Sequence, residues 1–142
     1  MIKKVFVIAN PLAGQPGDAI LSVLARVFQE AGIWWDIAIT HEMGDGTPLA
    51  EKALKDGPDV IAVYGGDGTV REVVTALIGT DVPLAVLPGG TGNLFSVGMG
   101  IPRNIRRAAR LISGPHRIRQ VDVGMAGEEA FLVAAATGLI AD

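Results

Sequence analysis

Apolar residues along the first two thirds of the chain alternate between continuous runs and stretches of helical spacing. Strands are predicted at the continuous runs, namely Lys4–Ala9, Trp35–Thr40, Val60–Tyr64 and Leu84–Leu87. Helices are predicted between them, over residues 19–31, Pro48–Lys55 and Thr69–Ile78, with Asp18 as N-cap and Gly32 and Gly79 as stops. This alternation predicts an α/β fold with an open, mainly parallel sheet and helices on both faces.

The pattern changes toward the end of the chain. Two strands are predicted in direct succession, at Ile118–Val123 and Ala130–Ala136, joined by the turn GMAGEE with no helix between them. Such a pair is typical of a β-hairpin. We therefore expect an α/β domain over residues 1–120, and over residues 121–142 the start of a truncated, β-rich second domain.

Composition and charge exclude several classes of protein. The net charge of −3 argues against a general nucleic-acid binder. The chain has no cysteine, which excludes disulfides and thiolate metal sites and fits a reducing compartment. Its apolar runs are shorter than the ~18 residues that a membrane span needs. We expect a cytoplasmic protein.

Glycine-rich segments follow three of the predicted strands. They read NPLAG after the first strand, GGDGT after the third and PGGTGN after the fourth. Ligands bind beyond the carboxyl ends of strands in open parallel sheets. Glycines allow positive φ and turn successive N–H groups toward one point, where helix N-termini add partial positive charge. Tight turns alone are the alternative, but three such loops at one edge favour a phosphate site.

Common phosphate-binding motifs are absent from the sequence. It has no G-x-x-x-x-G-K-[ST], and no G-x-G-x-x-G after a strand, so a P-loop enzyme and a standard dinucleotide-binding domain are disfavoured. GGDGT at Gly65–Thr69, NPLAG at Asn10–Gly14 and LPGGTGN at Leu87–Asn93 instead resemble the diacylglycerol kinase catalytic-domain family. That family includes bacterial lipid kinases and sphingosine kinases, and it is related to NAD kinases.

The resemblance implies which residues contact the nucleotide. They lie in the three loops, at the end of the second strand and at the start of the third helix: Asn10, Gly14, Thr40, Gly65, Gly66, Asp67, Gly68, Thr69, Glu72, Thr91, Gly92 and Asn93. The implied cofactors are ATP and Mg²⁺, and Asp67 would contact the metal indirectly, through the nucleotide. No catalytic residue is assigned, because the family's general base and part of its Mg²⁺ site come from a second, mostly β domain.

Three positions depart from the family pattern. Ala13 replaces the usual serine, Arg71 the usual asparagine, and Leu94 the aspartate of many relatives. The first change removes a hydroxyl donor, whereas Arg71 either meets a phosphate or faces solvent. Phosphate binding is still expected, while the acceptor, diacylglycerol, a sphingoid base or another lipid, stays open.

These observations leave three functional hypotheses. The first is the N-terminal, ATP-binding part of a lipid kinase that transfers the γ-phosphate of ATP to a lipid hydroxyl, inactive as a fragment. The second is an NAD kinase-like enzyme, against which the PGGTGN loop counts. The third is a non-catalytic nucleotide-binding domain. We also expect a homo-oligomer, because the last apolar strands would leave an unpaired edge.

Arginines gather in the segment PRNIRRAARLISG. Arg103, Arg106, Arg107 and Arg110 fall within an arc of about 100° of a predicted helix, and no acidic residue lies between positions 103 and 119. A solvated helix face is one interpretation. Peripheral contact with an anionic membrane is the other, since a lipid substrate is reached at a membrane.

Overall fold

The computed structural model of the chain describes residues 1–11, 17–89, 94–119, 122–126, 129–134 and 138–140. Its main sheet has the strand order β2-β1-β3-β4-β8-β5. In that order the strands are Trp34–Ile39, Lys4–Ala9, Val60–Gly65, Leu84–Pro88, Gly138–Ile140 and Arg117–Arg119. The first four are mutually parallel, β8 runs parallel to β4, and β5 is antiparallel to β8.

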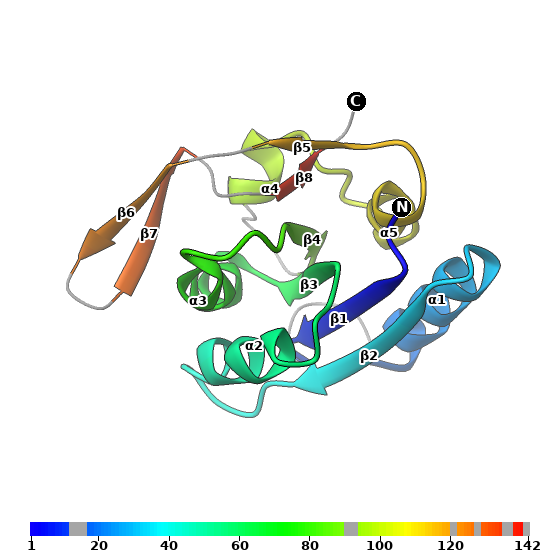
Figure 1. Cartoon of the computed structure of the whole chain (residues 1–142), viewed down its shortest axis with the longest axis horizontal. Coiled ribbons are helices and arrows are strands. Elements are labelled where there is room, and N and C mark those ends of the chain that lie inside the picture. Colours follow the sequence, from blue (N-terminus) through cyan, green and yellow to red (C-terminus); the bar gives the residue numbers. More distant parts are fainter. Residues whose placement is uncertain (12–16, 90–93, 120–121, 127–128, 135–137, 141–142) are drawn as a thin grey trace.

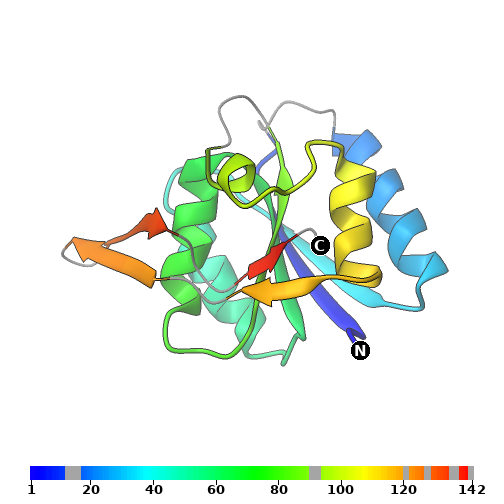
Figure 2. The same cartoon turned by 90° about the horizontal axis from the view of Figure 1, so that it is seen from above.

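Helices cover both faces of this sheet (Figures 1 and 2). α1 (Gly17–Glu30) and α5 (Ile105–Ser113) pack together on one face, and α2 (Gly46–Leu54) and α3 (Asp67–Leu77) pack together on the other. A short helix, α4 (Leu94–Gly98), follows β4. The predicted open parallel sheet with helices on both faces is therefore confirmed.

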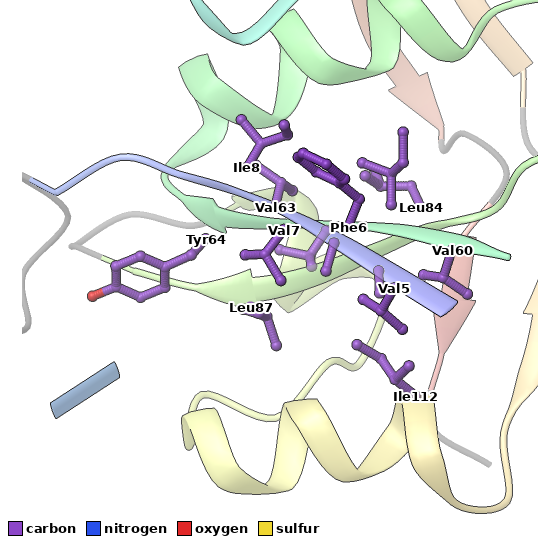
Figure 3. Close-up of a cluster of buried hydrophobic side chains, with 14 of the residues drawn as sticks. Val5, Phe6, Val7, Ile8, Val60, Val63, Tyr64, Leu84, Leu87 and Ile112 are labelled. Atoms are coloured by element: carbon purple, nitrogen blue, oxygen red, sulfur yellow. The ribbon is translucent and has the colours of Figure 1, made fainter. Parts of the chain in front are cut away.

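The core lies along β1 and β3, the central strands of the parallel part. All six residues of β3 are buried, because helices cover it from both sides, as the unalternating sequence VIAVY indicated. Figure 3 shows the aliphatic side chains of β1, β3 and β4 packed together, with Ile112 of α5 approaching from one face. This packing holds the strand ends in fixed positions beside one another.

Helix starts differ from the sequence-based expectation. α3 begins at Asp67, two residues before the predicted start, because Gly66 takes an extended backbone (φ −88°, ψ −173°) and serves as N-cap. α1 begins at Gly17, so Asp18 lies inside the helix rather than at its cap. The predicted stops are confirmed, since Gly32 and Gly79 have the positive φ of 68° and 81° that ends a helix.

The C-terminal hairpin forms, but its first strand is divided. Residues 117–119 form β5 in the main sheet, and β6 (Asp122–Ala126) then pairs antiparallel with β7 (Glu129–Ala134). β7 also contacts α3, so the apolar strand that we expected to be left uncovered has two neighbours. The chain then returns to the main sheet as β8, a strand that the sequence did not predict. The domain boundary at residue 120 stays a prediction.

An aspartate fixes the start of the central strand. The carboxylate of Asp59 accepts hydrogen bonds from the backbone N–H groups of Lys3 (2.8 Å) and Lys4 (2.9 Å). These two bonds, led by the one from Lys3, hold the pKa of Asp59 below its ordinary value of 3.8. Asp59 thus holds the start of β1 against β3, at the end of the sheet opposite the glycine-rich segments that follow the strands.

A glutamate joins the two helices of one face. The carboxylate of Glu72 in α3 accepts N–H bonds from Gly44 (3.1 Å) and Gly46 (2.8 Å), which lie just before and at the start of α2. The hydroxyl of Thr47 donates to the Glu72 carbonyl at 2.7 Å. Glu72 therefore holds the connection between β2 and α2, here called the β2–α2 loop (residues 40–46), against α3.

Asp45 tightens the same loop from within. Its carboxylate accepts the N–H groups of His41 (2.8 Å) and Glu42 (3.0 Å). These bonds, the one from His41 first, keep the pKa of Asp45 below its usual value. The β2–α2 loop is thus held by two carboxylates that both satisfy backbone donors.

The hydrogen bonds of Asp59 should make the stability of the fold fall at acid pH. A lowered folded-state pKa contributes stability above the unfolded pKa, and this contribution is lost as pH falls through the folded value. We expect the wild type to exceed Asp59→Asn in free energy of unfolding at neutral pH, and the gap to close as the pH falls through the lowered pKa of Asp59. Urea unfolding from neutral to acid pH measures this gap. Asp81→Asn, at an exposed position, is the control, and an equal pH-dependent gap there would contradict the assignment.

Glu72→Ala removes two charge-assisted bonds from backbone donors. We expect a loss of about 2 kcal/mol in the free energy of unfolding, together with faster hydrogen exchange at the amides of Gly44 and Gly46. Glu51→Ala, at an exposed position of α2, should cost no more than about 0.5 kcal/mol. Unchanged exchange at both glycines in Glu72→Ala would refute the role of Glu72 in holding the loop.

Candidate functional site

The strand order places a change in the direction of the connections at one edge of the sheet. From β1 the chain crosses to β2 on one side, and from β2 it passes back over β1 to β3 and then on to β4. The connections after β1 and β3 therefore leave toward opposite faces, which makes the carboxyl ends of β1 and β3 a topological switch point. We call the edge at which the parallel strands end the carboxyl edge.

Backbone hydrogen bonds bring three strand ends together at this edge. The N–H of Asn10, directly after β1, donates to the Tyr64 carbonyl of β3 at 2.8 Å. The N–H of Gly89, directly after β4, donates to the Gly65 carbonyl at 3.3 Å. The side chain amide of Asn10 also donates to the Thr69 hydroxyl at 3.4 Å. The ends of β1, β3 and β4 thus meet around the start of α3.

Gly65 is required by the close approach of α3. A Cβ added at Gly65 would lie 2.9 Å from the Cβ of Thr69, closer than side chains normally come. Positive φ is not the reason, because the described glycines with positive φ are Gly32, Gly44, Gly57, Gly79 and Gly100. The expectation that the GGDGT glycines need positive φ was therefore wrong, and at Gly65 the need is for space.

At Gly68, neither positive φ nor lack of space for a Cβ explains why the residue is glycine. It lies in the first turn of α3, has no positive φ, and an added Cβ would meet no atom within 4 Å. Glycine near a helix start is less favourable than alanine by about 0.5–1 kcal/mol. The backbone of Gly68 is instead open to close approach from outside, at a helix start whose first N–H groups have no partner within the helix.

Threonine hydroxyls line the same edge. Thr69, 8% exposed, receives the Asn10 amide. Thr40, 7% exposed, lies directly after β2, where its N–H donates to the Ala9 carbonyl at 2.9 Å and its hydroxyl lies 3.4 Å from the same oxygen. Asn10, Thr40 and Thr69 thus lie at neighbouring strand ends, as their positions in the sequence predicted.

The acidic candidates have different surroundings. Asp67 is half-buried in the first turn of α3, beside Gly66 and Gly68. The Glu72 carboxylate is already bonded to two amides of the β2–α2 loop, so it can act on a ligand only through that loop. Arg71 is exposed. Within the described segments no three His, Cys, Asp or Glu side chains are grouped as metal ligands would be.

Four predicted contacts, Gly14, Thr91, Gly92 and Asn93, lie outside the described residues. The structure also brings in two residues that the sequence did not single out, Asp45 and Gly46. Gly46 permits the approach of α3, since a Cβ there would lie 2.8 Å from the Cβ of Glu72. The Asp-Gly-Thr-Pro segment at residues 45–48, where α2 begins, was the available signal, because Asp and Gly at a helix cap and Pro in the first turn commonly mark helix starts.

Known proteins are similar to this chain in sequence and in fold. Probable lipid kinase YegS of Escherichia coli O6:K15:H31 is 36% identical over 116 residues, which are 79% of this chain and 38% of the relative. The protein of that name from Shigella flexneri is 35% identical over the same share. A crystal structure of a diacylglycerol kinase from Bacillus anthracis str. Sterne aligns with TM-score 0.80 and 37% identity, covering 92% of this chain and 46% of that one.

This chain spans less than half the length of each of these relatives. The sequence model described as the diacylglycerol kinase catalytic domain matches residues 4–126, which include β1, the GGDGT segment and β6. The chain therefore belongs to the diacylglycerol kinase catalytic-domain family.

Proposed function

We propose that this chain forms the nucleotide-binding part of an ATP-dependent lipid kinase. In the proposed reaction a lipid hydroxyl oxygen forms a bond to the γ-phosphorus of ATP, and the bond from that phosphorus to the β–γ bridging oxygen breaks. ADP leaves, and the hydroxyl proton passes to a general base. The residues described here would bind and orient the phosphates, which is the main requirement of phosphoryl transfer.

The open backbone at Gly68 carries this proposal. It is a glycine that neither conformation nor packing within the described chain demands, placed in the first turn of a helix at the switch point of a parallel sheet. A phosphate approaching a helix start needs this lack of a side chain, because N–H groups must come within hydrogen-bond distance of its oxygens. Membership in the kinase family supports the same assignment.

The proposed contacts follow from position at the carboxyl edge. The N–H groups of Gly66, Gly68 and Thr69 would face the phosphates, with Asn10 and Thr40 lining the neighbouring strand ends. Glu72 would act as a positioning residue, because it holds the β2–α2 loop next to Thr40. Gly14, Thr91, Gly92 and Asn93 are proposed as further contacts by their place in the family motifs.

Mg²⁺ would arrive with the nucleotide rather than in a cage of protein ligands. Asp67, in the first turn of α3, is the proposed carboxylate partner of that ion, through the phosphates. Mg²⁺ when bound would neutralise charge that develops on the transferred group. We propose that the general base comes from the part of the relatives that this chain does not cover, so this chain alone binds nucleotide weakly and does not transfer phosphate.

Two alanine substitutions separate ligand binding from stability. Gly68→Ala should weaken MgADP binding by at least about tenfold, because one added methyl blocks an N–H contact worth roughly 1.5 kcal/mol or more. Its free energy of unfolding should not fall, since the Cβ meets open space. Gly65→Ala should instead cost about 1–3 kcal/mol of stability by crowding Thr69. Calorimetry and urea unfolding measure the two quantities.

The control is Gly98→Ala in α4, where an added Cβ also meets no atom within 4 Å; it should bind MgADP like the wild type. Equal MgADP affinity in Gly68→Ala and wild type would refute the phosphate site. Lipid phosphorylation by this chain alone would contradict the proposal that the general base comes from the part of the relatives that this chain does not cover. Nucleotide binding without transfer in a protein of the relatives' full length would favour a non-catalytic domain.

We also propose that the chain self-associates, at the outer edge of the main sheet rather than through β7. β2 is an end strand, and Trp34 and Ile39 on it are 53% and 38% exposed. Exposed edge strands pair with further chains. Sedimentation at rising concentration should show dimers, and Ile39→Lys should reduce them. A monomer at high concentration would contradict this, as would equal association of Ile39→Lys and wild type.

A further inference from the structure

Helix α5 has an apolar side and a strongly cationic side. Its apolar side is buried in the core and consists of Ile105, Ala108, Ala109 and Ile112. On the other side Arg107 and Arg110 are exposed, Arg106 is half-buried, and Arg103 is exposed just before the helix. We call these four residues the arginine face. The three within the helix lie in an arc of about 100°.

Little within the chain neutralises the arginine face. No acidic residue occurs from position 103 to position 119, and among the described residues no carboxylate forms an ion pair with any of the four arginines. Among the side chains of the neighbouring helix α1 whose exposure is described, residues 19–30, one exposed cation, Arg26, is accompanied by one exposed acid, Glu30. A chain of net charge −3 thus places a third of its 12 lysines and arginines in one strip, of which Arg106 is half-buried and the other three are exposed.

The arginine face begins at the carboxyl edge. α5 runs antiparallel to the parallel strands, so its start and the start of α3 lie at the same end of the sheet (Figure 2). The hydrogen bond from the Arg107 N–H to the Asn104 side chain (3.0 Å) fixes this start. Arg103 and Arg106 thus lie toward the carboxyl edge, and Arg110 lies one helical turn farther from it.

We propose that the arginine face docks the protein on an anionic lipid surface. A strip of exposed guanidinium groups is attracted to the negative surface of a bilayer, with a contribution from each charge. Single-stranded nucleic acid is the less suitable partner, because residues 103–113, which carry the arginine face, contain no aromatic side chain on which bases could stack. No helix in the described segments is long and apolar enough to cross a bilayer.

Docking by this face would bring the carboxyl edge to the lipid headgroups. The inference rests on the charges of α5 and not on the proposed phosphoryl transfer, so it can be tested without nucleotide. Docking would also bring the protein within reach of a lipid acceptor, since the hydroxyl of such a molecule lies at the membrane surface.

The test is sedimentation of this chain with vesicles at low salt. Binding is expected to an equimolar mixture of phosphatidylcholine and phosphatidylglycerol, not to phosphatidylcholine alone, and should weaken as salt is raised. Arg107→Gln/Arg110→Gln should lower the vesicle affinity by about 25-fold, at about fivefold for each charge. Lys52→Gln/Lys55→Gln, which removes two exposed cations at α2 on the opposite face, should change it by less than about threefold.

Three results would overturn the proposal. They are absence of binding to the anionic vesicles at low salt, equal losses in the two double variants, and arginine-dependent binding of polyuridylate without binding of vesicles. Thermal unfolding of both variants should match the wild type, because all the substituted side chains are exposed. MgADP affinity should also stay unchanged in both, which separates failure of this inference from failure of the proposed nucleotide site.

Discussion

The contact between Gly65 and Thr69 is the constraint on which the rest of the arrangement depends. With no Cβ on Gly65, α3 begins directly at the end of β3, and Thr69 comes within reach of the Asn10 amide from β1. A larger residue would push the helix outward and separate its first turn from the neighbouring strand ends. The absence of a Cβ at Gly65 thus keeps the first turn of α3 beside the ends of β1 and β3.

Much of the fold follows from local patterns. β1 was predicted with its observed bounds and β3 within one residue, because each is a continuous apolar run between turn residues. Helix ends at Gly32 and Gly79 were readable, since an αL residue that stops a helix is nearly always glycine. Helix starts were harder to predict. Because Gly66 is extended, α3 begins at Asp67 rather than at Thr69, and nothing in the sequence GGDGT indicates which glycine is extended.

Contacts distant in sequence could not be read in the same way. β8 joins the main sheet beside β4, some fifty residues earlier in the chain, and a run as short as Gly-Leu-Ile has no periodicity to reveal it. At the candidate site the motifs indicated the correct edge, but the physical reasons for the glycines were different. Gly65 gives room to a threonine, and Gly68 leaves a surface open. The bonds of Glu72 to the β2–α2 loop depend on two helices meeting, which the sequence of neither reveals.

Glu72 has a consequence for how this family can change during evolution. Its carboxylate satisfies amides at positions 44 and 46, its carbonyl receives the hydroxyl at 47, and its Cβ occupies the space that a side chain at 46 would need. Substitutions within this set should therefore be epistatic, because the cost of one depends on the state of the others. A lineage that replaces the glutamate loses its bonds to the amides at 44 and 46, but any side chain at 72 keeps a Cβ against position 46, so glycine is expected to persist there.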